Sequence, residues 1–298
     1  MIFTVSRRTD VPNYYWEWFL NRLREGYLMV RNPQYPEKVS KYGFTKQDID
    51  GLMFLSKNYA PVLSTIGEIA KDYRTQYSYT ITAYGTDVEA NVPGIGDSVQ
   101  TFIDLSKIVG KEKMTWRFDP IAIYGKYDVG YHLAMFEQIA SYLSKYTEWV
   151  GFSFINMYDK VYYNMPGARE PNDEEKGRLL QGISETASKY DLKVLACKSP
   201  WAAQYGFYYG ACMTLSMLGD DWKDFKRKND CLMCGKIESR DVGIYHTCPN
   251  SCKYCYANSY PEVAMNKLKR FDVNSPMLLD TLRGDEIIHE AKQRRYAA

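Results

Sequence analysis

The sequence predicts an α/β protein and, within that class, a TIM-like (β/α) barrel, complete or partial. Three observations favour this fold. Short β-type runs alternate with longer helical patterns, which indicates parallel strands joined by crossover helices. The chain has 298 residues, close to the roughly 250 residues of one α/β barrel. Polar residues also collect where several strands end. A doubly wound open sheet shares this local pattern and is the second choice.

The elements follow in order along the chain. Strands are predicted at Ile2–Ser6, Gly51–Leu55, Tyr77–Ala83, Met114–Phe118, Val150–Ile155, Lys193–Ala196 and Val242–Tyr245. Helices are predicted at Trp16–Arg24, Pro61–Tyr73, Ser98–Val109, His132–Tyr146 and Glu174–Tyr190. The stretch 200–230 is ambiguous and can hold a weak eighth unit.

The domain organisation predicted is a single barrel over residues 1–271, which includes a cysteine-rich region at 197–258. Residues 272–298 form a tail that ends in a basic helical stretch, and we expect a surface appendage. His289, within that tail, has a helical setting.

The composition excludes several classes of function. Hydrophobic residues make up 45% of the chain, enough for a large core, and the net charge is only +2. A basic field for nucleic acid or an anionic membrane is therefore not indicated. No apolar run approaches the 18 residues or so of a membrane span. Charge appears by position 7, so a signal peptide is not indicated, and we expect a cytoplasmic protein.

Polar residues follow four of the predicted strands, at the edge where barrel enzymes place their chemistry. Each alone is typical of a salt bridge or a loop cap, but their arrival from four strands at one rim indicates a site. They are Arg7, Arg8 and Asp10 after the first strand, Lys57 and Asn58 after the second, Arg117 and Asp119 at the end of the fourth, and Asn156 after the fifth.

The stretch "HTCPNSCKYCYAN" holds three cysteines, Cys248, Cys252 and Cys255, spaced C-x3-C-x2-C. A reducing cytosol keeps thiols free, so clustered cysteines indicate metal ligands before disulfides. Thiolates are the ligands of iron–sulfur clusters, and four complete a cubane. Three in one loop leave one iron open, which is typical of a reactive site and allows an amino and carboxylate ligand to bind there.

This loop resembles the signature of radical S-adenosylmethionine enzymes, with an aromatic residue, Tyr254, before the third cysteine. The resemblance implies that Cys248, Cys252 and Cys255 bind a [4Fe–4S] cluster. It implies that S-adenosylmethionine sits on the fourth iron with its adenine near Tyr254. Reduction then releases a 5′-deoxyadenosyl radical that abstracts hydrogen. It also implies an electron donor such as flavodoxin or ferredoxin.

Most of residues 1–275 also resemble a narrower family of uncharacterised barrel proteins, through "VSRRTDVPNYY", "RNPQYP", "WRFDPI" and "DVGIYHTCPNSCKYCYAN". The cysteine loop follows the last strand here, whereas it follows the first strand in the usual radical enzyme. First and last strands of a barrel are neighbours, so the chain is interpreted as circularly permuted. "SRRTD" then replaces the usual Gly-Gly-Glu-like segment. Arg7, Arg8 and Asp10 are candidate ligands for the carboxylate and amino groups of S-adenosylmethionine, and Lys57, Arg117 and Asp119 join them at the rim.

The remaining cysteines are Cys197, Cys212, Cys231 and Cys234, and four thiolates suffice for an auxiliary [4Fe–4S] cluster. Two alternatives stay open. Cys197 and Cys212 are typical of buried small hydrophobes. Cys231, Cys234, Cys248 and Cys252 also resemble a zinc ribbon, although that arrangement leaves Cys255 without a role.

The sequence thus predicts a radical enzyme acting on a small-molecule or otherwise unknown substrate. The rival functions are an iron–sulfur protein that transfers electrons or carries clusters without radical chemistry, and a zinc-stapled barrel with hydrolase-like chemistry.

Overall fold

The computed structural model describes residues 1–196, 200–209, 227–228, 236–237, 239–258 and 260–292. Its centre is an eight-stranded sheet in the order β12-β1-β4-β5-β6-β7-β8-β9, in which every neighbouring pair is parallel. The strands are β1 (Ile2–Val5), β4 (Gly51–Ser56), β5 (Thr75–Thr80), β6 (Met114–Ile121), β7 (Trp149–Phe154), β8 (Lys193–Ala196), β9 (Tyr208–Tyr209) and β12 (Ser239–Asp241). The predicted α/β class and parallel sheet are confirmed.

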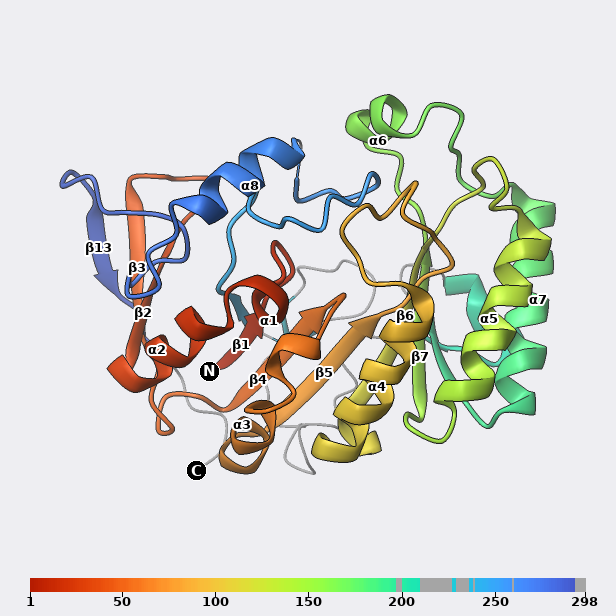
Figure 1. Cartoon of the computed structure of the whole chain (residues 1–298), viewed down its shortest axis with the longest axis horizontal. Coiled ribbons are helices and arrows are strands. Elements are labelled where there is room, and N and C mark those ends of the chain that lie inside the picture. The colour runs from red at the N-terminus through yellow and green to blue at the C-terminus, as the bar shows by residue number, and fades with distance from the viewer. Residues whose placement is uncertain (197–199, 210–226, 229–235, 238, 259, 293–298) are drawn as a thin grey trace.

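Helices connect these strands. They are α1 (Val11–Tyr14), α2 (Trp16–Glu25), α3 (Ile66–Asp72), α4 (Ile95–Val109), α5 (Val129–Leu143), α6 (Asp159–Asn164), α7 (Asp173–Lys189) and α8 (Pro261–Lys269), with short 3-10 turns at Ala60–Val62, Lys111–Lys113 and Pro200–Tyr205. A right-handed crossover places each connecting helix on the same side of a sheet whose strand order does not reverse. Figure 1 shows α3 and α4 in front of β4, β5 and β6.

The strand order bears on the choice between a barrel and a doubly wound sheet. A doubly wound sheet reverses its order at a switch point, and this sheet runs from β12 to β9 without reversal. Within the residues that the structure describes, β9 and β12 are the two ends and do not pair with each other. Closure into a barrel therefore stays a prediction.

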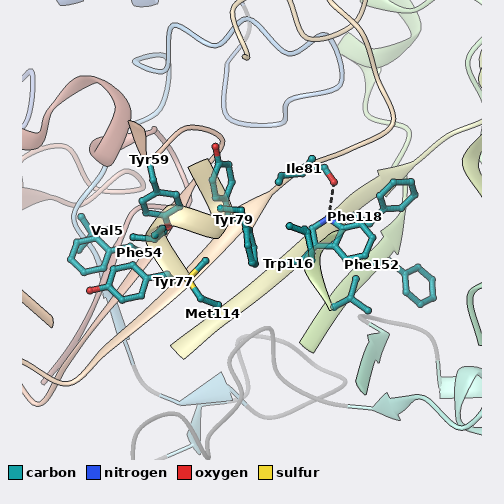
Figure 2. Packing of buried hydrophobic residues seen from close by; sticks show 14 of the residues in the cluster. Val5, Phe54, Tyr59, Tyr77, Tyr79, Ile81, Met114, Trp116, Phe118 and Phe152 are labelled. Carbon is teal, nitrogen blue, oxygen red and sulfur yellow. Dashed lines mark hydrogen bonds between the residues drawn. The ribbon is translucent and has the colours of Figure 1, made fainter. Parts of the chain in front are cut away.

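One face of the sheet packs its aromatic residues against the helices. Figure 2 shows Phe54, Tyr77, Tyr79 and Trp116 together in this core. The rings of Phe54 and Tyr77 stack with their centroids 5.3 Å apart, and the indole of Trp116 stacks on Phe136 of α5 at 4.9 Å. The Trp116 N–H donates to the carbonyl of Ile81 at 2.9 Å, so this buried donor is satisfied (Figure 2).

The opposite face of the sheet is polar, because side chains alternate along each strand. Thr4, Gln76, Ser78 and Thr115 are all buried there. The amide of Gln76 reaches the hydroxyl of Thr115 at 3.5 Å. The sheet therefore presents aromatic side chains to the helices on one face and polar side chains on the other face.

A second, three-stranded sheet lies beside the first. It contains β2 (Tyr27–Arg31), β3 (Lys38–Gly43) and β13 (Ile287–Glu290) in the order β13-β3-β2. β13 pairs parallel to β3, with Ile288 opposite Val39. A further short antiparallel pair joins β10 (Arg227–Lys228) and β11 (Lys236–Ile237).

This second sheet corrects two expectations about the tail. His289 lies in β13 and not in a helix. Residues 272–292 are also packed into the fold, because Met277 and Leu278 are fully buried and the indole of Trp18 donates to the carbonyl of Ser275 at 2.8 Å. The physical reason is the burial of two apolar side chains, Met277 and Leu278, in a segment that is hydrogen-bonded to α2 and β2.

The last predicted strand is displaced by three residues. β12 covers Ser239–Asp241, and the predicted Val242–Tyr245 is not a strand. The Asp241 carboxylate accepts the Gly243 N–H at 2.8 Å and turns the chain away from the sheet. The strand before the cysteine loop nevertheless pairs parallel to β1, so the predicted neighbourhood of the first strand and this last one is confirmed.

Candidate functional site

A cavity of about 420 Å³ opens at the carboxyl-terminal edge of the parallel sheet. Loops after β1, β4, β7 and β12 and the end of β6 form its wall, which is the position expected for a site in a parallel α/β protein. Ten of the predicted site residues line this cavity, namely Arg7, Arg8, Asp10, Lys57, Arg117, Asp119, Tyr254, Cys248, Cys252 and Cys255. Residues far apart in sequence therefore form one site.

The cysteine loop, residues 246–258, is closed on itself at its base. The His246 N–H donates to the carbonyl of Ala257 at 2.9 Å, and the Asn258 side-chain amide donates to the carbonyl of Cys248 at 2.7 Å. These bonds bring the two ends of the loop together. The three thiols are therefore held on a compact loop.

Two other segments hold the middle of the cysteine loop. Val88 accepts the N–H of Lys253 at 3.0 Å, and the neighbouring Glu89 forms a bridge with Cys252. From the N-terminal side, the Tyr15 hydroxyl donates to the carbonyl of Thr247 at 2.5 Å. The loop is thus fixed by the chain after β5 and by the chain after β1.

The three thiols are free and partly buried. Burial raises the pKa of both Cys248 and Cys252, so without a metal ion both thiols stay protonated at neutral pH. The sulfur of Cys255 accepts the N–H of Ala257 at 3.4 Å. Among the described residues, no group of three His, Cys, Asp or Glu side chains is placed to share one metal ion. Ligands of a multi-iron cluster bind different irons and stand further apart than ligands of a single ion.

Both carboxylate oxygens of Asp10 accept hydrogen bonds from the segments that surround the site. One carboxylate oxygen accepts from the Ser56 hydroxyl at 2.6 Å and the Asn13 N–H at 3.2 Å. The other accepts from the Lys57 N–H at 3.0 Å and the Asn250 amide at 2.8 Å. Burial raises the pKa of Asp10, while these hydrogen bonds lower it. Asp10 therefore ties α1, the end of β4 and the cysteine loop together.

Lys57 brings a buried positive charge beside the thiols. Its ammonium lies 2.8 Å from a carboxylate oxygen of Glu89 and 5.6 Å from the centre of the Tyr254 ring. Burial lowers the pKa of Lys57, but the charge and the hydrogen bond of Glu89 act in the opposite direction and the pKa is raised overall. The lysine therefore stays cationic.

Glu89 is a site residue that the sequence did not reveal. Besides Lys57, it accepts hydrogen bonds from the hydroxyls of Thr82 and Tyr254. Asp241 was missed in the same way, although it accepts from Ser6 at 2.6 Å and from the backbone N–H of Arg7 at 2.8 Å. Asp241 begins the quoted stretch "DVGIYHTCPNSCKYCYAN" but was given no role, and Glu89 lies in no quoted motif, because the partners that define each acid lie far away in sequence.

The two arginines after β1 form part of the wall. The guanidinium of Arg7 lies 3.7 Å from the Asp241 carboxylate, and the carbonyl of Arg7 accepts the Tyr256 hydroxyl at 2.6 Å. Arg8 donates to the carbonyl of Gly243 at 3.3 Å and lies over the Tyr245 ring. Both side chains retain N–H groups that can bind an oxyanion.

Arg117 and Asp119 lie on the wall formed by β6. They form an ion pair, and the Ser153 hydroxyl of β7 donates to the same Asp119 carboxyl group. Asn156 also lines the cavity, whereas Asn58 binds Asn13 through its side chain at 2.9 Å and supports α1. The cavity therefore has a thiol-bearing wall and a separate polar wall.

The other four cysteines, Cys197, Cys212, Cys231 and Cys234, lie outside the described residues. The auxiliary cluster and the zinc ribbon therefore stay predictions. Within the parts of the chain that the structure describes, no helix is both long and apolar enough to cross a membrane.

The fold and the cavity define a parallel α/β protein with a three-cysteine loop at the carboxyl-terminal edge of its sheet. The chain belongs to the family described as Domain of unknown function (DUF1848), whose model matches residues 2–257. This confirms the predicted membership of an uncharacterised family. The chain matches no curated protein and no solved structure.

Proposed function

We propose that this protein is an iron–sulfur enzyme of the radical S-adenosylmethionine type, with a sheet that closes into a circularly permuted barrel. One observation carries the proposal: three free thiols of a single loop line one cavity with Lys57 and three arginines, at the carboxyl edge of a parallel sheet. The resemblance of the C-x3-C-x2-C loop supports the same assignment.

The donor set fits an iron–sulfur cluster. Thiolates are the ligands such clusters require, and iron binding deprotonates a coordinating thiol even where burial raises its pKa. The charge of Lys57 near Cys252 favours the thiolate form. The Ala257 N–H on the Cys255 sulfur is a contact of the kind that tunes cluster potentials.

The residues have distinct roles in this proposal. Cys248, Cys252 and Cys255 would hold a [4Fe–4S] cluster, and Asp10 would position their loop. Arg7 and Arg8 would bind the carboxylate of S-adenosylmethionine, and Tyr254 would lie beside its adenine. Bound there, the cluster would pass one electron from a donor such as flavodoxin or ferredoxin to S-adenosylmethionine, which would yield methionine and a 5′-deoxyadenosyl radical. The wall with Arg117 and Asp119 would face the substrate. An oxygen-sensitive cluster suits the reducing cytoplasm.

The decisive experiment is metal analysis of the full chain purified without oxygen. We expect iron and sulfide, and an electron paramagnetic resonance signal after dithionite reduction that shifts when S-adenosylmethionine is added. Iron with a resonance signal that S-adenosylmethionine does not shift would indicate an electron-transfer or cluster-carrying protein without radical chemistry. Zinc without iron would overturn the proposal and favour the zinc-stapled barrel.

A substitution in the loop tests the ligand assignment. Cys252→Ala should abolish reductive cleavage of S-adenosylmethionine, measured as 5′-deoxyadenosine formed, and should remove the iron of this cluster. Lys253→Ala is the matched control, because Lys253 is exposed and binds Val88 and Asn164 through its backbone. Full iron and activity in Cys252→Ala would contradict the assignment.

The auxiliary cluster has a separate test. Two cubanes give about eight irons per chain and one gives about four. Cys234→Ala should lower the iron content by about half while the S-adenosylmethionine-dependent signal shift remains. Loss of all metal in that variant would mean that the two-cluster partition is wrong.

A further inference from the structure

A second cavity of about 700 Å³ adjoins the cysteine cavity and is lined by four arginines. We call it the arginine chamber. Arg7 and Arg8 come from the loop after β1, Arg31 ends β2, and Arg240 lies in β12. Arg7, Arg8 and Tyr256 line both cavities, so they form the wall between them.

The four arginines differ in how their charge is balanced. Arg31 is neutralised by Asp280 and Glu286, each 2.6 Å from its guanidinium. Arg7 lies 3.7 Å from Asp241, the one carboxylate that lines the chamber. Over the part of the chain that the structure describes, Arg8 and Arg240 have no carboxylate within 4.0 Å. The chamber therefore has an excess of positive charge.

The two arginines without a carboxylate are held in place by tyrosine rings. The guanidinium carbon of Arg8 lies 5.0 Å from the centre of the Tyr245 ring, and that of Arg240 lies 5.3 Å from the centre of the Tyr42 ring. A guanidinium over an aromatic face keeps the N–H groups in its own plane available to other acceptors. Such a planar fork matches the geometry of carboxylate and phosphate oxygens.

We propose that the arginine chamber binds the phosphate group of a small organic ligand. A phosphate monoester carries about −1.5 to −2 charges at neutral pH, and two unbalanced arginines complement that charge better than they complement a single carboxylate. The net charge of the whole chain is only +2, so the attraction is local to a concave site and not a field for a nucleic-acid backbone. Arg8 lines both cavities, so the proposal is tested through Tyr42 and Arg240, which do not line the cysteine cavity and need neither iron nor S-adenosylmethionine.

The test is calorimetric titration of the full chain with inorganic pyrophosphate, with and without reconstituted iron. We expect saturable binding at one site in both preparations. Arg240→Gln should weaken it by about tenfold or more, because a charge-assisted contact is lost. Arg178→Gln, which changes an exposed arginine of α7, should leave the affinity unchanged.

A second variant covers the case in which Arg240→Gln disturbs the fold. Tyr42→Leu keeps every arginine but removes the ring beneath Arg240, and we expect weaker pyrophosphate binding with an unchanged circular dichroism spectrum. No saturable binding, or equal affinity in Arg240→Gln, would overturn the proposal. Tighter binding of citrate than of pyrophosphate would overturn the phosphate class. An oligonucleotide that binds without competition from pyrophosphate would overturn the small-ligand assignment. None of these outcomes bears on cleavage of S-adenosylmethionine, so the two proposals fail separately.

Discussion

At the scale of single residues, the site depends on a buried acid, Asp10, whose hydrogen bonds hold the surrounding segments in place. Asp10 accepts four hydrogen bonds from three segments of the chain, and its two oxygens are filled by donors from Asn13, Ser56, Lys57 and Asn250. Asn250 lies between Cys248 and Cys252 in the cysteine loop. Asp10 therefore acts on the thiols through the loop that carries them.

Asp10→Asn should show this positioning role. In this variant the new NH2 group faces N–H or O–H groups that donate to the Asp10 carboxylate. Those buried donors lose their acceptor, which lowers the free energy of unfolding by about 1–3 kcal/mol. Urea unfolding measures the loss, and iron retained after gel filtration reports on the loop. Asp97→Asn, the same change at an exposed position, should alter neither. An unchanged unfolding midpoint in Asp10→Asn would mean that the four hydrogen bonds contribute no net stability.

At the scale of secondary-structure elements, His132 links α5 to the chain after β6. Its Nε2 lies 2.8 Å from the carbonyl of Ala122, and among the described residues its Nδ1 has no hydrogen-bond partner. Tyr84 and Phe118 pack edge-on against the imidazole, and Asp128 is the nearby acid. Burial lowers the pKa of His132 below its ordinary 6.5, so the imidazole is neutral in the folded protein.

This setting predicts a loss of stability in acid. Below pH 6.5 the unfolded chain binds a proton at His132 that the folded chain does not bind, so the free energy of unfolding falls as the pH falls. The slope for one proton is at most about 1.4 kcal/mol per pH unit. His132→Gln can still donate to Ala122, and it should flatten the slope measured by urea unfolding between pH 7 and pH 5. Equal slopes in the two proteins would contradict the prediction.

The elements that the sequence predicted are those with strong local patterns. β8 was predicted with its observed bounds, because it is a short buried run. β2, β3 and β13 were missed, because strands at the side of the fold mix exposed and buried residues, and β13 is exposed throughout. Their pairing depends on contacts between residues 38–41 and 287–290, which no local pattern records.

The candidate site divides in the same way. The three cysteines were predictable because their chemistry is specific and their spacing is short. Arg7, Lys57 and Arg117 were found because they follow strands that end at one rim. Glu89 in a loop and Asp241 at the end of β12 were not found, since a single acid has no signature until its distant partners are known.

At the scale of the whole molecule, the tail completes the domain. The guanidinium of Arg22 in α2 donates to the carbonyl of Asn274 at 2.8 Å, and the backbone N–H of Met29 in β2 donates to that of Pro276 at 2.8 Å. Met277 is 0% exposed and Leu278 is 1% exposed. The tail thus covers α2 and β2, the elements that follow the first strand.

Met277→Ala should therefore destabilise the entire protein. Removal of a fully buried methionine side chain costs about 2–5 kcal/mol. Leu282→Ala is the matched control, since Leu282 is 41% exposed and a surface substitution stays within about 0.5 kcal/mol. Thermal unfolding followed by circular dichroism measures both. Similar melting temperatures for the two variants would show that the tail docks without contributing to stability.

The pairing of β1 with β12 can form only late in the synthesis of the chain. Thr4 and Ser239 meet across this pair, 235 positions apart. At about 5–20 residues per second, the ribosome needs on the order of tens of seconds to make the chain between them. Throughout that interval the nascent polypeptide exposes one unpaired edge of its first strand. The thiol loop is synthesised after β12, so the strands that surround it are made before it, and under the proposed function iron would be delivered late in synthesis or after it.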